Sequence, residues 1–181
     1  MVKKVRKGGK AMLSDQFANI FRGEHRQVRD TLLDLILAFQ ERNRARIQSL
    51  LNQTATLTGP HFRYEEEALY PSLVEIFGEE YIGHLLVDHD RAIDIAKRVI
   101  GLANKDPLTD DDVSEAIRLI RMVLPHVSDC EGLSIMVELL SEEKIRSILE
   151  VRGRALQAGL GLLSWAEEMR ARSIELKGGI K

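Results

Sequence analysis

Apolar residues recur along the chain with the spacing of amphipathic helices. Ser14 followed by Asp15 is a favourable helix start, and the positions after it place one apolar stripe on one face. That stripe contains Phe17, Phe21, His25, Val28, Leu32, Leu35, Ile36 and Phe39. The polar run 40–46 predicts a turn, after which a second stripe runs from Ile47 to Ala68. The first half of the chain therefore predicts two helices that bury histidine within an apolar face.

Three further helices are predicted in the second half. Gly78 marks a connection before a stripe from Ile82 to Ile100, which includes His89. The loop 104–112 precedes a fourth helix that carries His126, and Ser141 starts a fifth helix, over 142–172. Within the second helix, Gly59-Pro60 predicts a kink and Pro71 is compatible with its end.

No segment shows the strict alternation or the β-branched runs of a strand, so the predicted fold class is all-α. Helices of this length joined by short loops pack as an up-down-up-down four-helix bundle. The predicted division is a flexible basic N-terminal arm over 1–13, the bundle over 14–140, and an additional C-terminal helix over 141–181. That last helix is expected to pack on the bundle or on a partner subunit.

Composition narrows the function classes. The chain has 181 residues, 44% of them apolar, and a net charge of −2, which gives no reason to propose nucleic acid as a partner. It shows neither the apolar run of a secretory signal peptide nor the roughly 18 uninterrupted apolar residues of a membrane span. The single cysteine, Cys130, excludes an intrachain disulfide. We therefore predict a cytoplasmic protein with no membrane partner.

The histidines carry the candidate chemistry. One histidine on an apolar face is usually a core residue, but His25, His61, His89 and His126 fall on or beside the inward stripes of four different helices. Glu65 follows His61 by four positions, so the two project from one helix face about 40° apart. A buried carboxylate without a partner would cost several kcal/mol, and a metal ion is an obvious partner. Imidazole with carboxylate suits Fe, Mn or Zn.

At these residues the chain resembles a known family. GPHFRYEEEALYP around His61, DHDRA around His89 and EHRQVRD around His25 are similar to the motifs of the hemerythrin-like, or HHE cation-binding, family. The resemblance covers roughly His25 to Glu131 and implies a four-helix bundle that holds a non-haem di-iron centre. The two iron ions would be oxo- or hydroxo-bridged when oxidised, and Mn or Zn are less favoured occupants. The implied metal ligands are His25, His61, Glu65, His89, His126 and Glu131.

Two positions depart from the family pattern. Many members have a carboxylate four positions after the last histidine, but here Cys130 stands there and Glu131 comes one later. The five-residue spacing resembles that of the oxygen-carrying hemerythrins, so Glu131 is assigned as the second bridge and Asp129 as a poorer choice. Oxygen carriers also have a further histidine four before the third-helix one. His84 lies five before His89, about 140° around the helix, and is kept as an additional candidate.

The neighbouring residues allow several interpretations. Cys130 could sense redox state, bind iron as a thiolate or simply pack. Tyr64 and Tyr70 could hydrogen-bond the groups behind the ligands, or pack as amphipathic residues. Glu66 and Glu67 are expected to face solvent.

The resemblance implies a protein that binds or senses dioxygen or another small diatomic or peroxide ligand, or that handles iron. The alternatives are a di-iron oxidoreductase acting on peroxide or nitric oxide, an iron donor in cluster repair, or a structural bundle with incidental metals. A homodimer through the C-terminal helix is also predicted, because that helix is apolar along one face.

Overall fold

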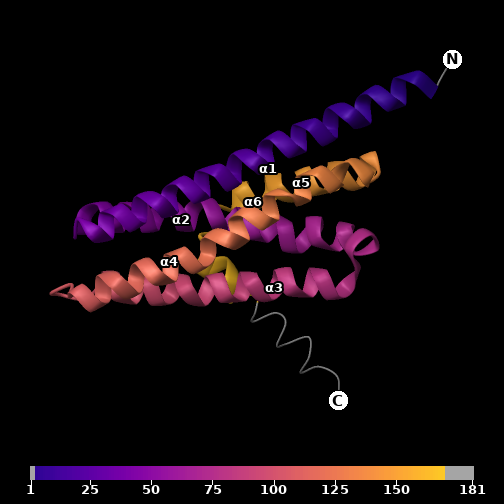
Figure 1. Ribbon diagram of the computed structural model, residues 1–181. Helices are drawn as coiled ribbons and strands as arrows, with labels where there is room; N and C mark the ends of the chain where they lie inside the picture. The colour runs from indigo at the N-terminus through magenta and orange to yellow at the C-terminus, as the bar shows by residue number, and fades with distance from the viewer. Residues whose placement is uncertain (1–2, 170–181) are drawn as a thin grey trace.

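The computed structural model describes the backbone of residues 3–169 and the side chains of residues 12–169 (Figure 1). The longer helices are α1 (Lys3–Gln40), α2 (Arg44–Tyr64), α3 (Tyr70–Ala103), α4 (Asp110–Glu131) and α6 (Glu142–Ala158). Three short elements connect them: the π-helix η1 (Glu65–Leu69), α5 (Leu133–Met136) and the 3-10 helix η2 (Val137–Leu139). No strand occurs in residues 3–169, and the predicted all-α class is confirmed.

The predicted chain reversals are confirmed. Between α1 and α2 the Asn43 side chain accepts a hydrogen bond from the Arg46 backbone N–H and caps α2. Gly78 has a φ of 82°, which a glycine adopts without strain, and it interrupts α3 so that the chain turns back. Thr109 and Asp112 form a capping box at the start of α4. Figure 1 shows the resulting arrangement, in which α3 and α4 lie side by side.

Three predicted helix ends were wrong. Helix α1 begins at Lys3, and Ser14 is a buried residue inside it. The helix from Arg44 continues past Pro71 to Gly78, because the wider π turn of η1 lies just before the proline. Helix α6 ends at Ala158, since Gly159 adopts a left-handed conformation with a φ of 62°, and helix resumes over 162–169.

The C-terminal helix α6 packs on α1 and α2. Its residues Ile145, Ile148 and Val151 are buried in one cluster with Phe21 and Tyr64. Part of the apolar face that suggested a homodimer is thus covered within the chain, whereas Leu156 on it is 48% exposed, and the homodimer stays a prediction. Residues 1–2 of the predicted arm and 170–181 of the predicted C-terminal segment lie outside the described residues, and the domain division stays a prediction.

Three apolar clusters fill the described part of the bundle, and the histidines lie between the two largest. Phe21 and Leu85 belong to one cluster, while Val28 and Ile95 belong to the other. His25 and His89 fall between these positions on their helices, so the fold places these histidines where the two apolar clusters meet. Gly59 lets the chain at Leu160 pack closely on α2, because a Cβ there would come within 2.1 Å of the Leu160 carbonyl oxygen.

Candidate metal centre

Four helices and the π-helix bring the predicted ligands together in the interior. His25 comes from α1, His61 from α2, His89 from α3 and His126 from α4, and all four surround Glu65 of η1. The first three histidines and Glu65 are at most 5% exposed, and the His126 side chain is 10% exposed. The rings form two pairs, with centroids 4.5 Å apart for His25 and His61 and 5.0 Å apart for His89 and His126.

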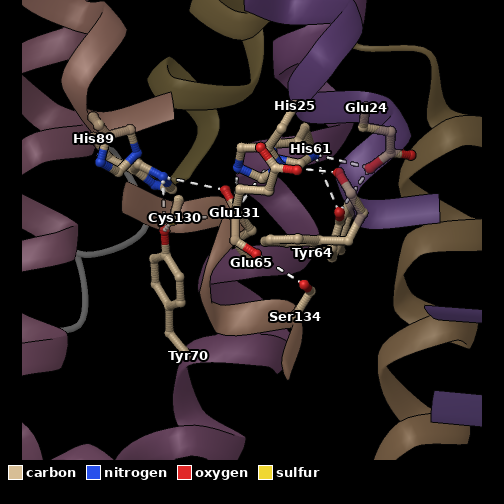
Figure 2. A network of polar contacts seen from close by, with 12 residues as sticks. Glu24, His25, His61, Tyr64, Glu65, Tyr70, His89, Cys130, Glu131 and Ser134 are labelled. Atoms are coloured by element: carbon tan, nitrogen blue, oxygen red, sulfur yellow. Dashed lines mark hydrogen bonds and ion pairs between the residues drawn. The ribbon is translucent and has the colours of Figure 1, made fainter. Parts of the chain in front are cut away.

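Glu65 lies between the two ring pairs. Its Oε1 is 3.4 Å from His61 Nε2 and 4.0 Å from His25 Nε2, and its Oε2 is 3.2 Å from His89 Nε2. Figure 2 shows His89 on one side of this carboxylate and His61 on the other. Oε2 is buried and has no hydrogen-bond partner, which is costly for a carboxylate oxygen. A buried oxygen without a hydrogen bond, faced by imidazole nitrogens, fits a cation site.

The other nitrogen of three rings is already occupied. His25 Nδ1 lies 2.9 Å from the Phe21 carbonyl oxygen, His61 Nδ1 lies 2.9 Å from Glu24 Oε2, and His89 Nδ1 lies 2.9 Å from Glu66 Oε1. Such partners fix the tautomer and the orientation of a ligand imidazole and raise its basicity. Each of the three rings therefore directs Nε2 towards Glu65, as metal binding requires.

Glu24 connects His61 to a larger network. The Tyr64 hydroxyl donates to Glu24 Oε2 over 2.7 Å (Figure 2). Arg152 Nε donates to Glu24 Oε1 over 2.7 Å. Sequence reasoning missed both Glu24 and Arg152. Glu24 lies beside His25 but off the apolar stripe, and Arg152 stands in α6 without a motif around it.

The expectation that Glu66 faces solvent was wrong, whereas Glu67 is exposed as expected. The Glu66 side chain is 11% exposed and contacts His89. In the π-helix η1 the Tyr70 backbone N–H bonds the Glu65 carbonyl oxygen, five residues back. This wider turn changes the angular spacing of the residues, so Glu65 and Glu66 both reach histidines. The run Glu65–Glu67 before Pro71 is the sequence signal that could have indicated it.

Cys130 lies closer to the centre of the cluster than the sequence suggested. It is fully buried, and its Sγ is 3.6 Å from Glu65 Oε1 and 3.3 Å from the Tyr70 hydroxyl. One ligand atom from each of His25, Glu65 and Cys130 lies within 4.8 Å of the others, which is a geometry that could hold a metal ion. The thiol thus lies one helical turn after His126 on α4, on the side of the cluster.

The remaining candidates differ in their placement. Glu131 is half-buried at the edge of the cluster, and its negative charge acts on His25. His84 is exposed on α3, and Asp129 is exposed on α4. The structure therefore gathers His25, His61, Glu65, His89 and His126 with Cys130, leaves Glu131 beside them and keeps His84 at the surface.

Burial and charge shift the pKa values in different directions. Burial alone would lower the pKa of His61, but the Glu65 and Glu24 carboxylates outweigh it and raise that pKa to about 10. Burial would raise the pKa of Glu65, yet His61 and His89 hold it well below its usual range. The pKa of His126 is lowered to about 4 by burial and by the charge of His89. In the metal-free cluster Glu65 is therefore ionised and carries a negative charge.

Three spaces meet at His126. A void of about 20 Å³ is lined by His126 together with His25, His61 and Glu65. An apolar cavity of about 80 Å³ adjoins it and shares Val28, Phe62 and Val127 with that void. A surface pocket of about 120 Å³ reaches His126 from the side of Asp88. His126 thus lines both the void in the cluster and two further spaces, one apolar and one polar.

Comparison with family models gave one finding. The model described as "Hemerythrin HHE cation binding domain" matches residues 16–133. This range contains every histidine of the cluster and ends before α6. Searches of curated proteins and of solved structures gave no significant match. Within residues 3–169, no helix is long and apolar enough to cross a membrane.

Proposed function

The chain belongs to the hemerythrin HHE cation-binding family, and on this premise we propose that it holds two iron ions and binds or senses dioxygen or handles iron. The observation that supports this most is Glu65, whose buried Oε2 has no hydrogen bond and faces His89 Nε2 at 3.2 Å. A carboxylate between two pairs of imidazoles suits a bridge between two metal ions.

The proposed ligands are His25, His61, Glu65, His89, His126 and Glu131. His25 and His61 would bind one ion, His89 and His126 would bind the other, and Glu65 would lie between the two pairs. The geometry adds Cys130 to this set, because its Sγ lies near the ligand atoms of His25 and Glu65. Mn or Zn remain less favoured occupants. When bound, iron would supply a site for reversible dioxygen binding and the electrons that reduce dioxygen.

The chain's own residues define the surroundings of that chemistry. Phe21 and Glu24 hold the rings of His25 and His61 so that their Nε2 atoms face inward. The apolar lining of the cavity beside His126 favours a small uncharged ligand. These features support a diatomic ligand, in a protein that we place in the cytoplasm.

One observation favours the alternative, an oxidoreductase acting on peroxide or nitric oxide. The Tyr70 hydroxyl lies 3.0 Å from His89 Nε2 and 3.3 Å from Cys130 Sγ, so a proton donor stands at the ligands. A nearby donor promotes turnover of a bound ligand, whereas an apolar surrounding preserves it. Steady consumption of peroxide or nitric oxide that Tyr70→Phe abolishes would favour the enzyme. Transfer of iron from the loaded protein to an acceptor would instead favour an iron donor.

The test is metal content with the visible spectrum, measured on protein prepared with and without air. About two irons per chain, with ferric absorption that bleaches on reduction and returns with oxygen, is expected. The double variant His61→Ala/Glu65→Ala should lose this signal, while Glu67→Ala, an exposed neighbour, should keep it. Absence of iron and of the spectrum after anaerobic iron loading would contradict the proposal.

A further inference from the structure

The C-terminal helix α6 lies outside the residues that match the family, yet it reaches the metal cluster. Arg152 of α6 donates from Nε to Glu24 Oε1 over 2.7 Å, and its Nη2 lies 2.6 Å from the same oxygen. These side chains are 23% and 20% exposed, so the pair is shielded from most of the solvent. A charge-assisted contact made by two nitrogens fixes the carboxylate more firmly than a single hydrogen bond.

The orientation of Glu24 matters because its other oxygen serves the cluster. Oε2 accepts from the Tyr64 hydroxyl over 2.7 Å and lies 2.9 Å from His61 Nδ1. With Arg152 on Oε1, the Glu24 carboxylate cannot rotate towards solvent without losing its contacts with Arg152, Tyr64 and His61. Without the guanidinium, a partly exposed glutamate gains rotamer freedom and the hydration it would find at the surface.

We propose that Arg152 is a positioning residue for the metal centre, which acts through Glu24 to hold His61 with Nε2 directed at the metal. This inference rests on the proposed function, since it concerns the affinity of that same centre. It makes α6 a part of the site, although the family match ends at residue 133. A partner that displaced α6 would accordingly weaken metal binding without touching a ligand.

A purely structural role for Arg152 is the competing explanation, because the ion pair also ties α6 to α1. The chain offers a matched control for this role. Lys144 of α6 pairs with Glu75 of α3 at 3.0 Å, an exposed contact that also ties α6 to the bundle but does not reach the cluster. A surface pair of this kind contributes little to stability. Lys144→Met therefore removes a tether alone.

The experiment compares Arg152→Met, Glu24→Ala, their double variant and Lys144→Met, with Zn²⁺ as the probe metal. Methionine retains the length and apolar contacts of arginine but not its charge. We expect Arg152→Met to weaken Zn²⁺ binding by up to the roughly 10–100-fold that is usual when the partner directly behind a histidine ligand, here Glu24, is removed. Glu24→Ala should weaken it at least as much, and the double variant no more than Glu24→Ala. Arg152→Lys should restore part of the affinity.

A second readout uses the metal-free protein. The His61 Nδ1 proton should give a slowly exchanging downfield NMR resonance, which Arg152→Met should broaden and Lys144→Met should leave in place. The inference is overturned if Arg152→Met matches Lys144→Met in both measurements, or if the losses of Arg152→Met and Glu24→Ala simply add. If the unchanged protein binds no metal at all, the proposed function fails, whereas the NMR signal still tests the role of Arg152.

Discussion

His61 and His126 line the same void, but the protein holds them differently. His61 is 5% exposed, its Nδ1 lies 2.9 Å from Glu24, and its pKa is raised to about 10 by the carboxylates around it, against the effect of burial. His126 Nδ1 lies 3.9 Å from Asp88 Oδ2, too far for a hydrogen bond, and its pKa is lowered to about 4. Hydrogen bonds hold His61, which a pocket of about 430 Å³ also reaches, whereas His126 lies beyond hydrogen-bond distance of Asp88. Ligand exchange is therefore expected at His126, the less firmly held histidine.

The largest effect should follow from removing the group that the two sides share. Glu65→Ala deletes the carboxylate between His61 and His89, so Zn²⁺ affinity should fall by more than about 100-fold, beyond the loss typical of an outer partner. Equilibrium competition with a chelator measures this. Glu67→Ala, which changes an exposed glutamate on the same π-helix, is the control. Equal affinities in the two variants would refute the bridging position.

The difference between the two histidines should appear in metal-free stability. His61→Ala removes the one ring that contacts both Glu65 and Glu24. Because His89 and Arg152 still contact these carboxylates, the cost should reach at most about 3–5 kcal/mol. His126→Ala breaks no hydrogen bond of this kind and should cost about 1 kcal/mol. Urea unfolding at pH 7 gives both values. Similar losses of stability in His61→Ala and His126→Ala would mean that the protein holds the two histidines equally firmly.

The pH dependence of metal binding should be set by the His61 side. Below its pKa of about 10, metal-free His61 carries a proton that a metal must displace, and the carboxylates of Glu65 and Glu66 raise the pKa of His89 as well. Zn²⁺ affinity should therefore rise at least about tenfold per pH unit between pH 6 and 8. His126, with a pKa of about 4, releases no proton there. Calorimetry in buffers of different ionisation enthalpy counts the protons released. His126→Ala should keep this count, and an unchanged count in His61→Ala would contradict the assignment.

The same shifts set the stability of the metal-free fold. His61 has a raised pKa, so it stabilises the fold below pH 6.5, and this contribution is lost as pH rises towards about 10. His126 has a lowered pKa, so the fold loses stability as pH falls from 6.5 towards about 4. Metal-free protein should therefore be most stable near pH 6.5, as thermal unfolding across pH would show.

The smallest effect is expected at Cys130. Cys130→Ala should cost about 1 kcal/mol of stability, because the thiol packs in a fully buried position. On Co²⁺-loaded protein, however, it should remove a near-ultraviolet thiolate-to-cobalt band, since Sγ lies near the ligand atoms of His25 and Glu65. Glu131→Ala should leave that band in place. A spectrum without the band in the unchanged protein would assign Cys130 to packing.

Much of this arrangement followed from the sequence. The 3.6-residue period placed one histidine on the inward face of each of four helices, and the four-residue spacing placed Glu65 beside His61. Both are local properties of a helix, so periodicity is sufficient to predict them. The exposure of His84 agrees with its five-residue spacing from His89, which turns it away from that face.

What the sequence did not indicate depends on departures from helix regularity or on distant partners. Glu66 reaches His89 because η1 is a π-helix, and angular arithmetic for an α-helix misplaces it. Cys130 stands four positions after His126, so the spacing that placed Glu65 beside His61 also favours Cys130 over Glu131, and the assignment of Glu131 went against it. Arg152 pairs with a residue in another helix, and a single sequence contains no sign of that pairing.

The Arg152–Glu24 contact joins residues 128 positions apart. During synthesis all four cluster histidines leave the ribosome before Arg152 does, and domains fold as their chain emerges. Contacts of such long range also form late, since a large loop must close first. A nascent chain should thus assemble the bundle with a loosely held His61 and bind metal most tightly only once α6 has emerged from the ribosome and packed on α1.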